Sequence, residues 1–478
     1  MAATNPDPNG ADPNGAASNS SGQGCEADAA LGFLAKNASC PESAASQNLK
    51  LVTPDPQPFH WQALAGICLG VLMFTLDGSI VNIAIPTFLR EFHTTLIQAK
   101  WIVLAYLIVI VVFLLPVGRA AVFAGRKNIF LGGLGLFTAG SLLCGSAWDL
   151  RSLVAFRVVQ GAGAVGMAAL MSSLVLANAP RGKVGQSLGM ITTFATLGTS
   201  LGPTIGGFLI TWFGWRSLFF VNLPVGLAAV YLVARFVRPD PPAEGGFRLR
   251  ALLPDFSLFS NRVFSNGIFG RFVTMAVNGG YLFLAPLLLE NALHFSTVKA
   301  GLLLATTPVI GGITAPFFGA LSDRFGVARF NLAGLAFMFA AVFFMGGFFV
   351  GMTGGGFILR VCLWGLGLGV FNAPNTVCIM KSVPQGETGT ASALLSLSIM
   401  LGQAVGVAGM AAMFHHQSGA AEGGALALPP AAIVSGVSTT LLAAMIPLGL
   451  VLLLNALSAP AISRACRQAD QTSARARE

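Results

Sequence analysis

The sequence predicts an all-α integral membrane protein with about twelve transmembrane helices in two pseudo-symmetric six-helix bundles. Charged residues make up only 9% of the 478 positions and apolar residues 54%, whereas a soluble protein carries roughly 25% charged residues. Long apolar runs recur along the chain, and a loop motif is repeated in its two halves. The chain therefore has too few polar residues to cover a surface in water, and we expect lipid to surround it.

Twelve apolar runs are long enough to cross a bilayer, which takes about 20 residues. The first six lie near 62–86, 99–118, 128–148, 152–178, 187–213 and 217–237. The second six lie near 264–289, 298–320, 329–351, 355–380, 388–414 and 431–458. We therefore expect bundles at 61–238 and 264–460, joined by a polar, Pro-rich cytoplasmic linker at 239–263. The polar segments 1–60 and 461–478 are predicted to be cytoplasmic tails, the first of them disordered.

The distribution of positive charge predicts the orientation, because cytoplasmic loops are enriched in Lys and Arg. Most basic residues fall on the side that would hold both termini. The few on the other side are Arg90, Lys100, Arg151, Arg216 and Lys299. Both termini are therefore expected in the cytoplasm, and the absence of eukaryotic sorting signals favours a bacterial inner membrane.

Several function classes are excluded by what the sequence lacks. The net charge of +9 is spread as single residues and pairs between apolar runs, which argues against nucleic-acid binding. The seven cysteines are scattered, and there is no Walker loop, so no metal, cofactor or ATP site is expected. The expected partners are the bilayer, a small-molecule substrate and protons, and the chain is expected to be a monomer.

The stretch RVVQGAGAVGM at 157–167 has the glycine spacing of a dinucleotide-binding loop. Such a loop needs a preceding strand and an acidic residue about 20 positions later, but no acid occurs between Asp149 and Asp240. We interpret Gly161 and Gly163 as small residues that let helices pack closely.

Two loops repeat a pattern between the halves, GRAAVFAGRK at 118–127 and GALSDRFGVAR at 319–329. Repeated bundles about a central cleft are a common transporter plan. The residues assigned to gating in these loops are Gly118, Gly125, Arg126, Gly319, Asp323, Arg324 and Gly326.

Five stretches in order resemble the drug:proton antiporter branch of the major facilitator superfamily, whose members usually have fourteen spans. These are LDGSIVNIAIP at 76–86, the loop at 118–127, Arg157-x-x-Gln160-Gly161-x-Gly163, GTSLGPTIGG at 198–207 and WRSLFFVNLP at 215–224. The resemblance covers about 62–458 and implies proton-coupled antiport by alternating access. This sequence departs from the family in having Val122 and Phe123 at the loop's acidic and basic positions, which puts the usual inner gate in doubt. It also lacks the two additional central spans.

Asp77 is the one acidic residue well inside an apolar run. Ionisable groups inside a membrane usually line a pathway, so we expect Asp77 to gain and lose a proton during transport. Arg157 lies in the same predicted half of the membrane and is its expected partner in proton coupling. The alternatives are a structural Asp77 bonded to a neighbouring helix and an Arg157 that only ties helices together.

Other polar residues in the runs are candidates for a substrate cavity. These are Asn82, Gln160, Asn278, Glu290, Asn372, Asn375 and Gln403. For Glu290, attraction of cations at the outer mouth and exposure to solvent are equally compatible with the sequence. The scarcity of polar residues favours hydrophobic or amphipathic substrates, and the buried acid suggests that they are cationic.

Gly198, Gly202 and Gly206 recur every four residues and share one helix face. With Pro203, which loosens helical hydrogen bonding, they predict a bendable surface for close packing and for rocking between the halves.

These features favour a secondary exporter that expels hydrophobic compounds in exchange for protons. The leading alternative is a proton- or solute-coupled importer with the same fold. A membrane enzyme is disfavoured because no Ser–His or Cys–His pair looks assembled, and only Val122 and Phe123 hint at a sensor or scaffold.

Overall fold

The computed structural model describes residues 61–178, 184–239, 257–383, 388–418 and 428–475, and these parts of the chain are helical, with no strand among them. The predicted tail at 1–60 and most of the predicted linker lie outside the described residues. Contacts group 59–478 as one compact unit, so the predicted boundary between two bundles stays a prediction.

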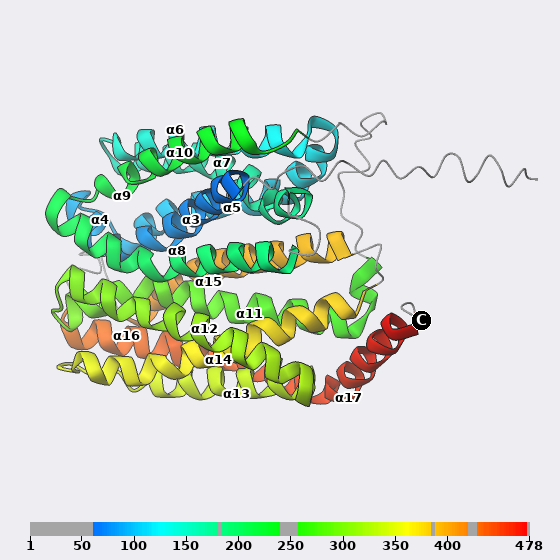
Figure 1. Ribbon diagram of the computed structural model, residues 1–478. Helices are drawn as coiled ribbons and strands as arrows, with labels where there is room; N and C mark the ends of the chain where they lie inside the picture. Colours follow the sequence, from blue (N-terminus) through cyan, green and yellow to red (C-terminus); the bar gives the residue numbers. More distant parts are fainter. Residues whose placement is uncertain (1–60, 179–183, 240–256, 384–387, 419–427, 476–478) are drawn as a thin grey trace, which may run out of the picture. The chain divides into compact units, whose positions relative to one another are not determined.

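Helices occupy all twelve ranges that the apolar runs predicted (Figure 1). In the first half they are α3 (Trp61–Ile83) with α4 (Ile85–Glu91), α5 (Leu96–Ala124), α6 (Arg126–Gly145), α7 (Leu150–Asn178), α8 (Val184–Phe213), and α9 (Ser217–Phe220) with α10 (Asn222–Phe236). In the second half they are α11 (Arg262–Leu287) with the π-turn η3 (Leu288–Ala292), α12 (Thr297–Phe325), α13 (Val327–Met345), α14 (Gly354–Lys381), α15 (Thr388–Gln417), and α16 (Pro430–Ala443) with α17 (Met445–Arg475). The 3-10 turn η2 (Ser257–Ser260) precedes α11.

Eleven helical segments of the described chain are long and apolar enough to cross a membrane, and α8 is the segment that is not among them. Large apolar side chains such as Ile313, Phe317 and Leu359 are exposed on the surface. In a bilayer these side chains meet hydrocarbon, as the low charge content predicted.

The last helix extends further than the sequence predicted. The apolar run was expected to end at 458, but α17 continues to Arg475. The segment expected to form a tail from 461 is thus helical over most of its length. Its Ala, Arg and Gln residues are good helix formers, so helix formation continues beyond the apolar run.

Glycines bring neighbouring helices into backbone contact, as predicted for the GxGxxG run. A Cβ atom on Gly163 would lie 2.3 Å from the Phe137 amide nitrogen and 2.7 Å from the Gly133 carbonyl oxygen of α6. A Cβ on Gly161 would lie 3.1 Å from the Tyr106 carbonyl oxygen of α5. These residues therefore serve packing, and a larger side chain would force the helices apart.

The glycine face of α8 packs on α3, and rocking between the halves stays a prediction. Gly198 and Gly202 lie against Thr75 and Ser79 of α3, and Gly206 lies against Ile83. The close packing is present, but it joins two helices of the same half and does not form the surface between the halves. A face of α8 rotated from this one reaches the second half, because helix rotation follows tertiary packing as well as residue spacing.

The contact between halves uses Pro203 and Gly207 of α8. A Cβ on Gly301 of α12 would lie 2.2 Å from the Pro203 carbonyl oxygen, and a Cβ on Gly207 would lie 2.7 Å from the Thr297 carbonyl oxygen. Thr204 donates a hydrogen bond of 3.5 Å to the Gly301 carbonyl. The halves are therefore in contact at the ends of α8 and α12 that are predicted to face outward.

Candidate functional site

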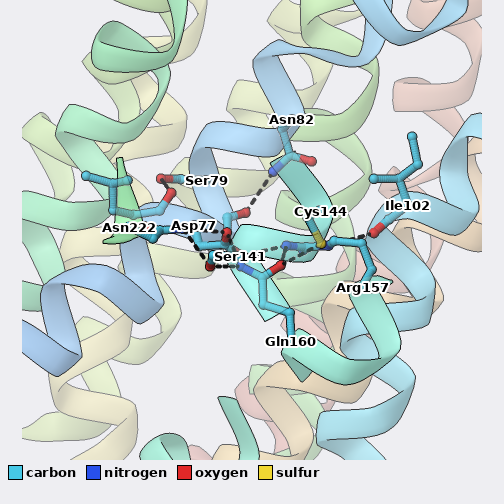
Figure 2. Close-up of polar contacts among 11 residues, drawn as sticks. Asp77, Ser79, Asn82, Ile102, Ser141, Cys144, Arg157, Gln160 and Asn222 are labelled. Carbon is cyan, nitrogen blue, oxygen red and sulfur yellow. Dashed lines mark hydrogen bonds and ion pairs between the residues drawn. The ribbon is translucent and has the colours of Figure 1, made fainter. Parts of the chain in front are cut away.

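A buried polar network surrounds Asp77 in the C-terminal part of α3 (Figure 2). The Asp77 side chain has no exposed surface. Its Oδ2 lies 2.6 Å from Nη1 of Arg157, and its Oδ1 accepts hydrogen bonds from Gln160 at 2.8 Å and Asn222 at 3.2 Å. The ion pair that the sequence predicted is therefore present, and both carboxylate oxygens have donors.

Arg157 ties three helices together. Besides Asp77 of α3, it donates through Nε to the Ile102 carbonyl oxygen of α5 at 3.1 Å and through Nη1 to Gln160 Oε1 at 2.7 Å. Its guanidinium lies 4.2 Å from the centroid of the Tyr106 ring, a cation–π contact. The positive charge of Arg157 is thus compensated on several sides at a position that is only 1% exposed.

The start of α7 places Arg157 at this depth. The Asp149 carboxylate accepts a hydrogen bond of 2.7 Å from the Ser152 amide, and the Ser152 hydroxyl accepts one of 3.1 Å from the Asp149 amide. This exchange satisfies donors at the helix N-terminus, and the bonds from Ser152 lower the pKa of Asp149. Arg157 follows about two turns later, facing α3.

Ser141 and Asn222 complete the network, and the sequence analysis did not identify either of them. The Ser141 hydroxyl of α6 accepts from Gln160 at 2.8 Å and from Asn222 of α10 at 3.3 Å. Gly140 permits this approach, because a Cβ there would lie 2.6 Å from the Gln160 Cα. A signal for Asn222 was available, since it is the Asn of the WRSLFFVNLP stretch.

Two predicted cavity residues are sealed inside the protein. Gln160 and Asn375 have no exposed surface; Gln160 belongs to the Asp77 network, and Asn375 donates to the Gly267 carbonyl at 3.1 Å. Their assignment to a cavity is therefore corrected for this conformation. The sequence showed polar residues in apolar runs but could not show which were enclosed by neighbouring helices.

The other amide candidates are half-buried. Asn82 donates to the Gly78 carbonyl of its own helix at 3.1 Å. Asn278 of α11 accepts from the Trp364 indole at 3.1 Å, and Asn372 of α14 accepts from Arg271. Gln403 of α15 lies with its backbone against Gly279 of α11. Asn278, Asn372 and Asn375 thus each form a hydrogen bond across the contact of α11 with α14.

Glu290 joins the two halves. Its Oε2 lies 3.4 Å from Nη2 of Arg90 in α4, and the Glu290 side chain is only 4% exposed. Neither alternative from the sequence describes this arrangement, since Glu290 neither faces solvent nor lies open to cations. It forms an ion pair between the halves near the contact of α8 with α12.

Residues 67–407 match the family model of the Major Facilitator Superfamily. The chain belongs to this superfamily. It is 31% identical over 408 residues to the riboflavin transporter RibZ of Clostridioides difficile (strain 630), covering 74% of this chain and 88% of that protein.

Other Major Facilitator relatives carry names that refer to drug resistance. The putative multidrug resistance protein MdtD of Cronobacter sakazakii (strain ATCC BAA-894) is 28% identical over 432 residues, covering 78% of this chain and 90% of that protein. The multidrug resistance protein Stp of Mycobacterium tuberculosis (strain ATCC 25618 / H37Rv) is 26% identical over 394 residues, covering 71% and 73%. A solved bacterial homologue of the human lysosomal transporter Spinster has the same fold, with a TM-score of 0.70 at 18% identity, covering 86% of this chain and 98% of that one.

The two repeated loops of this Major Facilitator chain have the same backbone form. Gly125 and Gly326, which end α5 and α12, have φ of 84° and 99°, values that favour glycine. A Cβ added to Gly118 would lie 3.6 Å from the Ala169 Cβ, and one added to Gly319 would lie 3.5 Å from the Ala373 Cβ. Both loop starts therefore have an alanine as neighbour, at ordinary contact distance.

The charged positions of these loops are described only in part. Arg126 begins α6, and Arg324 is exposed in the last turn of α12. The side chains of Val122, Phe123 and Asp323 lie outside the described residues. The expectation about the inner gate therefore stays a prediction.

Proposed function

We propose that this Major Facilitator transporter is a secondary active exporter that moves hydrophobic or amphipathic compounds in exchange for protons. The fully buried Asp77–Arg157 ion pair carries the proposal. A charged pair inside an apolar bundle has a large desolvation cost, and ionisable groups inside membranes commonly serve as proton relays. Within the described spans, Asp77 lies well inside a helix, whereas Glu290 lies near the end of the span Arg262–Ala292.

The proposed step is protonation of Asp77. A neutral carboxyl group attracts the guanidinium of Arg157 far less, so that Arg157 is held by the Ile102 carbonyl, Gln160 and the Tyr106 ring. The bond between α3 and α7 is weakened while the bond between α5 and α7 remains. The first half then has two arrangements that differ by one proton, and alternating access requires such a two-state element.

Proton exchange requires a second conformation. Asp77 and Gln160 have no exposed surface here, so water reaches the carboxylate only after neighbouring helices separate. The glycine contacts of α7 with α6 at Gly163 and Gly166 are suited to such a movement, because they bring backbone against backbone. We propose that the conformation described here is the proton-sealed one.

The direction of transport is proposed from the relatives named for multidrug resistance, which favour export. Import is the second candidate, and it is favoured by the 31% identity to a riboflavin transporter, which makes riboflavin a compound to test. We further propose that the protein is a monomer in a bacterial inner membrane with both termini in the cytoplasm.

The test is transport by purified protein in liposomes with an imposed pH gradient. Riboflavin and a panel of amphipathic dyes are followed together with the internal pH. We expect the substrate to move in the direction opposite to the protons. We expect Asp77→Asn to abolish this movement because the amide cannot exchange a proton. Glu91→Gln is the matched control, since Glu91 is half-exposed and forms only a long ion pair, of 3.9 Å, with Arg216.

The proposal fails if Asp77→Asn transports against the gradient as well as the wild type does. Substrate movement in the same direction as protons identifies import and overturns the exporter assignment. Size-exclusion profiles and thermal unfolding of both variants separate loss of coupling from loss of folding.

A further inference from the structure

The contact between α11 and α14 is a polar seam, which consists of Gly267, Arg271 and Asn278 on α11 and Trp364, Asn372 and Asn375 on α14. Three side-chain hydrogen bonds cross it, from Asn375 to Gly267, from Arg271 to Asn372 and from Trp364 to Asn278. The two helices run antiparallel, because the partners descend along α14 as they ascend along α11. Arg271, Asn278 and Asn372 are half-buried, so part of the seam remains accessible.

Arg271 places a positive charge in this seam, and no acid in the described part of the chain forms an ion pair with it. Its hydrogen-bond partner is the neutral amide of Asn372, and its Nε is buried with no acceptor. Among the described residues the ion pairs are Arg90–Glu290, Arg157–Asp77 and Arg216–Glu91, and none includes Arg271. A guanidinium has five N–H donors in a planar fork, so most of the donor capacity of Arg271 is unused.

An uncompensated charge inside a membrane span is costly, and such residues generally mark the route of a substrate or ion. Arg157 does not have this property, since Asp77 neutralises it. Asp77 in turn has both oxygens occupied and is sealed from the exterior. Asp77, the acid that suggested cationic substrates, is therefore not available to bind such substrates. The charge that remains accessible in the polar seam is that of Arg271, and it is positive.

We propose that Arg271, with Asn372 beside it, binds an anionic group of the transported compound, namely a carboxylate, phosphate or sulfonate. The planar fork of arginine matches such groups by forming two parallel hydrogen bonds. This inference rests on the proposed transport function and narrows its substrate class to anionic amphipathic compounds. The sequence analysis placed Arg271 inside a predicted span without assigning it a role.

The experiment measures binding of two matched probes to the purified full-length protein in nanodiscs of zwitterionic lipid. Dansyl-phenylalanine carries a carboxylate, and its amide has the same apolar body without the charge. We expect the wild type to bind the carboxylate at least about tenfold more tightly, the scale of a hydrogen bond to a charged group. Arg271→Gln should remove that preference and Arg271→Lys should keep part of it.

Arg360→Gln is the control variant, since Arg360 is a half-buried arginine on α14 that bonds to its own helix at Gly356. It should keep the preference of the wild type. Equal affinity of the wild type for the two probes overturns the proposal, whether or not any variant folds. A preference that survives in Arg271→Gln also overturns it.

A lipid headgroup is the other source of an anion, and nanodiscs with phosphatidylglycerol test it. Displacement of the lipid by the carboxylate probe supports a substrate site. Retention of phosphatidylglycerol by the wild type but not by Arg271→Gln, without displacement by the probe, assigns Arg271 to a lipid and overturns the proposal.

Transport in liposomes separates this proposal from the proposed function. Proton-coupled movement of neutral compounds alone supports the transporter and contradicts the anion site. An Arg271-dependent preference without any proton-coupled movement supports the anion site and contradicts the proposed coupling.

Discussion

The two halves of the molecule are built on the same frame, displaced by about 200 residues. Gly125, which follows α5, and Gly326, which follows α12, are 201 residues apart. The same separation relates the N-cap residues Thr95 and Ser296, which both bond an amide in the first turn of the following helix. His93 and His294, with φ of 46° and 55°, complete equivalent turns. The repeat predicted from two loops therefore extends to capping and turn geometry.

A hydrogen bond between equivalent helices is also present in both halves, but it joins different residue types. Gln160 of α7 donates to Asp77 of α3, and Trp364 of α14 donates to Asn278 of α11, the residue 201 positions after Asp77. The first half has an acid there, neutralised by Arg157. The second half has an amide, and its charge, Arg271, lies about two turns away along α11. A common frame thus supports a sealed ion pair in one half and an accessible cation in the other.

The largest expected effect is that of replacing Arg157 in the first half with Gln. The same substitution at Arg271 in the second half gives the comparison. Arg157→Gln leaves Asp77 as a buried acid without its ion pair and should lower the free energy of unfolding by about 3–5 kcal/mol. Arg271→Gln removes a charge that has no ion pair and leaves no acid unpaired, so it should lower the free energy of unfolding by less than Arg157→Gln does. Thermal unfolding in detergent measures both. Equal losses would show that the halves do not differ in charge compensation.

The next largest effect tests the close glycine packing that the two halves share. Gly163→Ala and Gly367→Ala each place a methyl group against a neighbouring backbone, at 2.3 Å from the Phe137 nitrogen and 2.9 Å from the Met338 nitrogen. Both should destabilise the protein, by about 1–3 kcal/mol, with the larger loss at Gly163. Gly135→Ala is the control, because nothing lies within 4 Å of its Cβ position. A loss confined to one half would contradict the common packing.

The smallest effect concerns the ion pair that joins the halves. Arg90 is 53% exposed, so its bond with Glu290 should contribute at most about 1 kcal/mol. Arg90→Gln should raise the population with separated outer ends by up to about fivefold. Distances between spin labels in the α4–α5 and η3–α12 loops measure this population.

Arg216→Gln is the control for this ion pair, since Arg216 pairs with Glu91 and bonds Ala147 within the first half. Its distance distribution should match that of the wild type. An unchanged distribution in Arg90→Gln would show that the glycine contacts of α8 with α12 close this end without the ion pair.

The helices and the central ion pair were predictable from the sequence. Each run of about 20 apolar residues must satisfy its own backbone hydrogen bonds in lipid, and a helix does this locally. Asp77 and Arg157 stood out because charges inside such runs are rare and costly without a partner. The loop glycines Gly125 and Gly326 were likewise visible, because positive φ strongly favours glycine.

Tertiary structure alone decided which helix each residue meets. The glycines of α8 face α3, Ser141 and Asn222 reach Asp77, and Gln160 and Asn375 are enclosed. Helix periodicity fixes which residues share a face, but the rotation of that face towards a neighbour depends on packing over the whole bundle. For the same reason the sequence showed that Arg271 lies in a span, and only the packing of α11 on α14 showed that no acid of the described chain neutralises it.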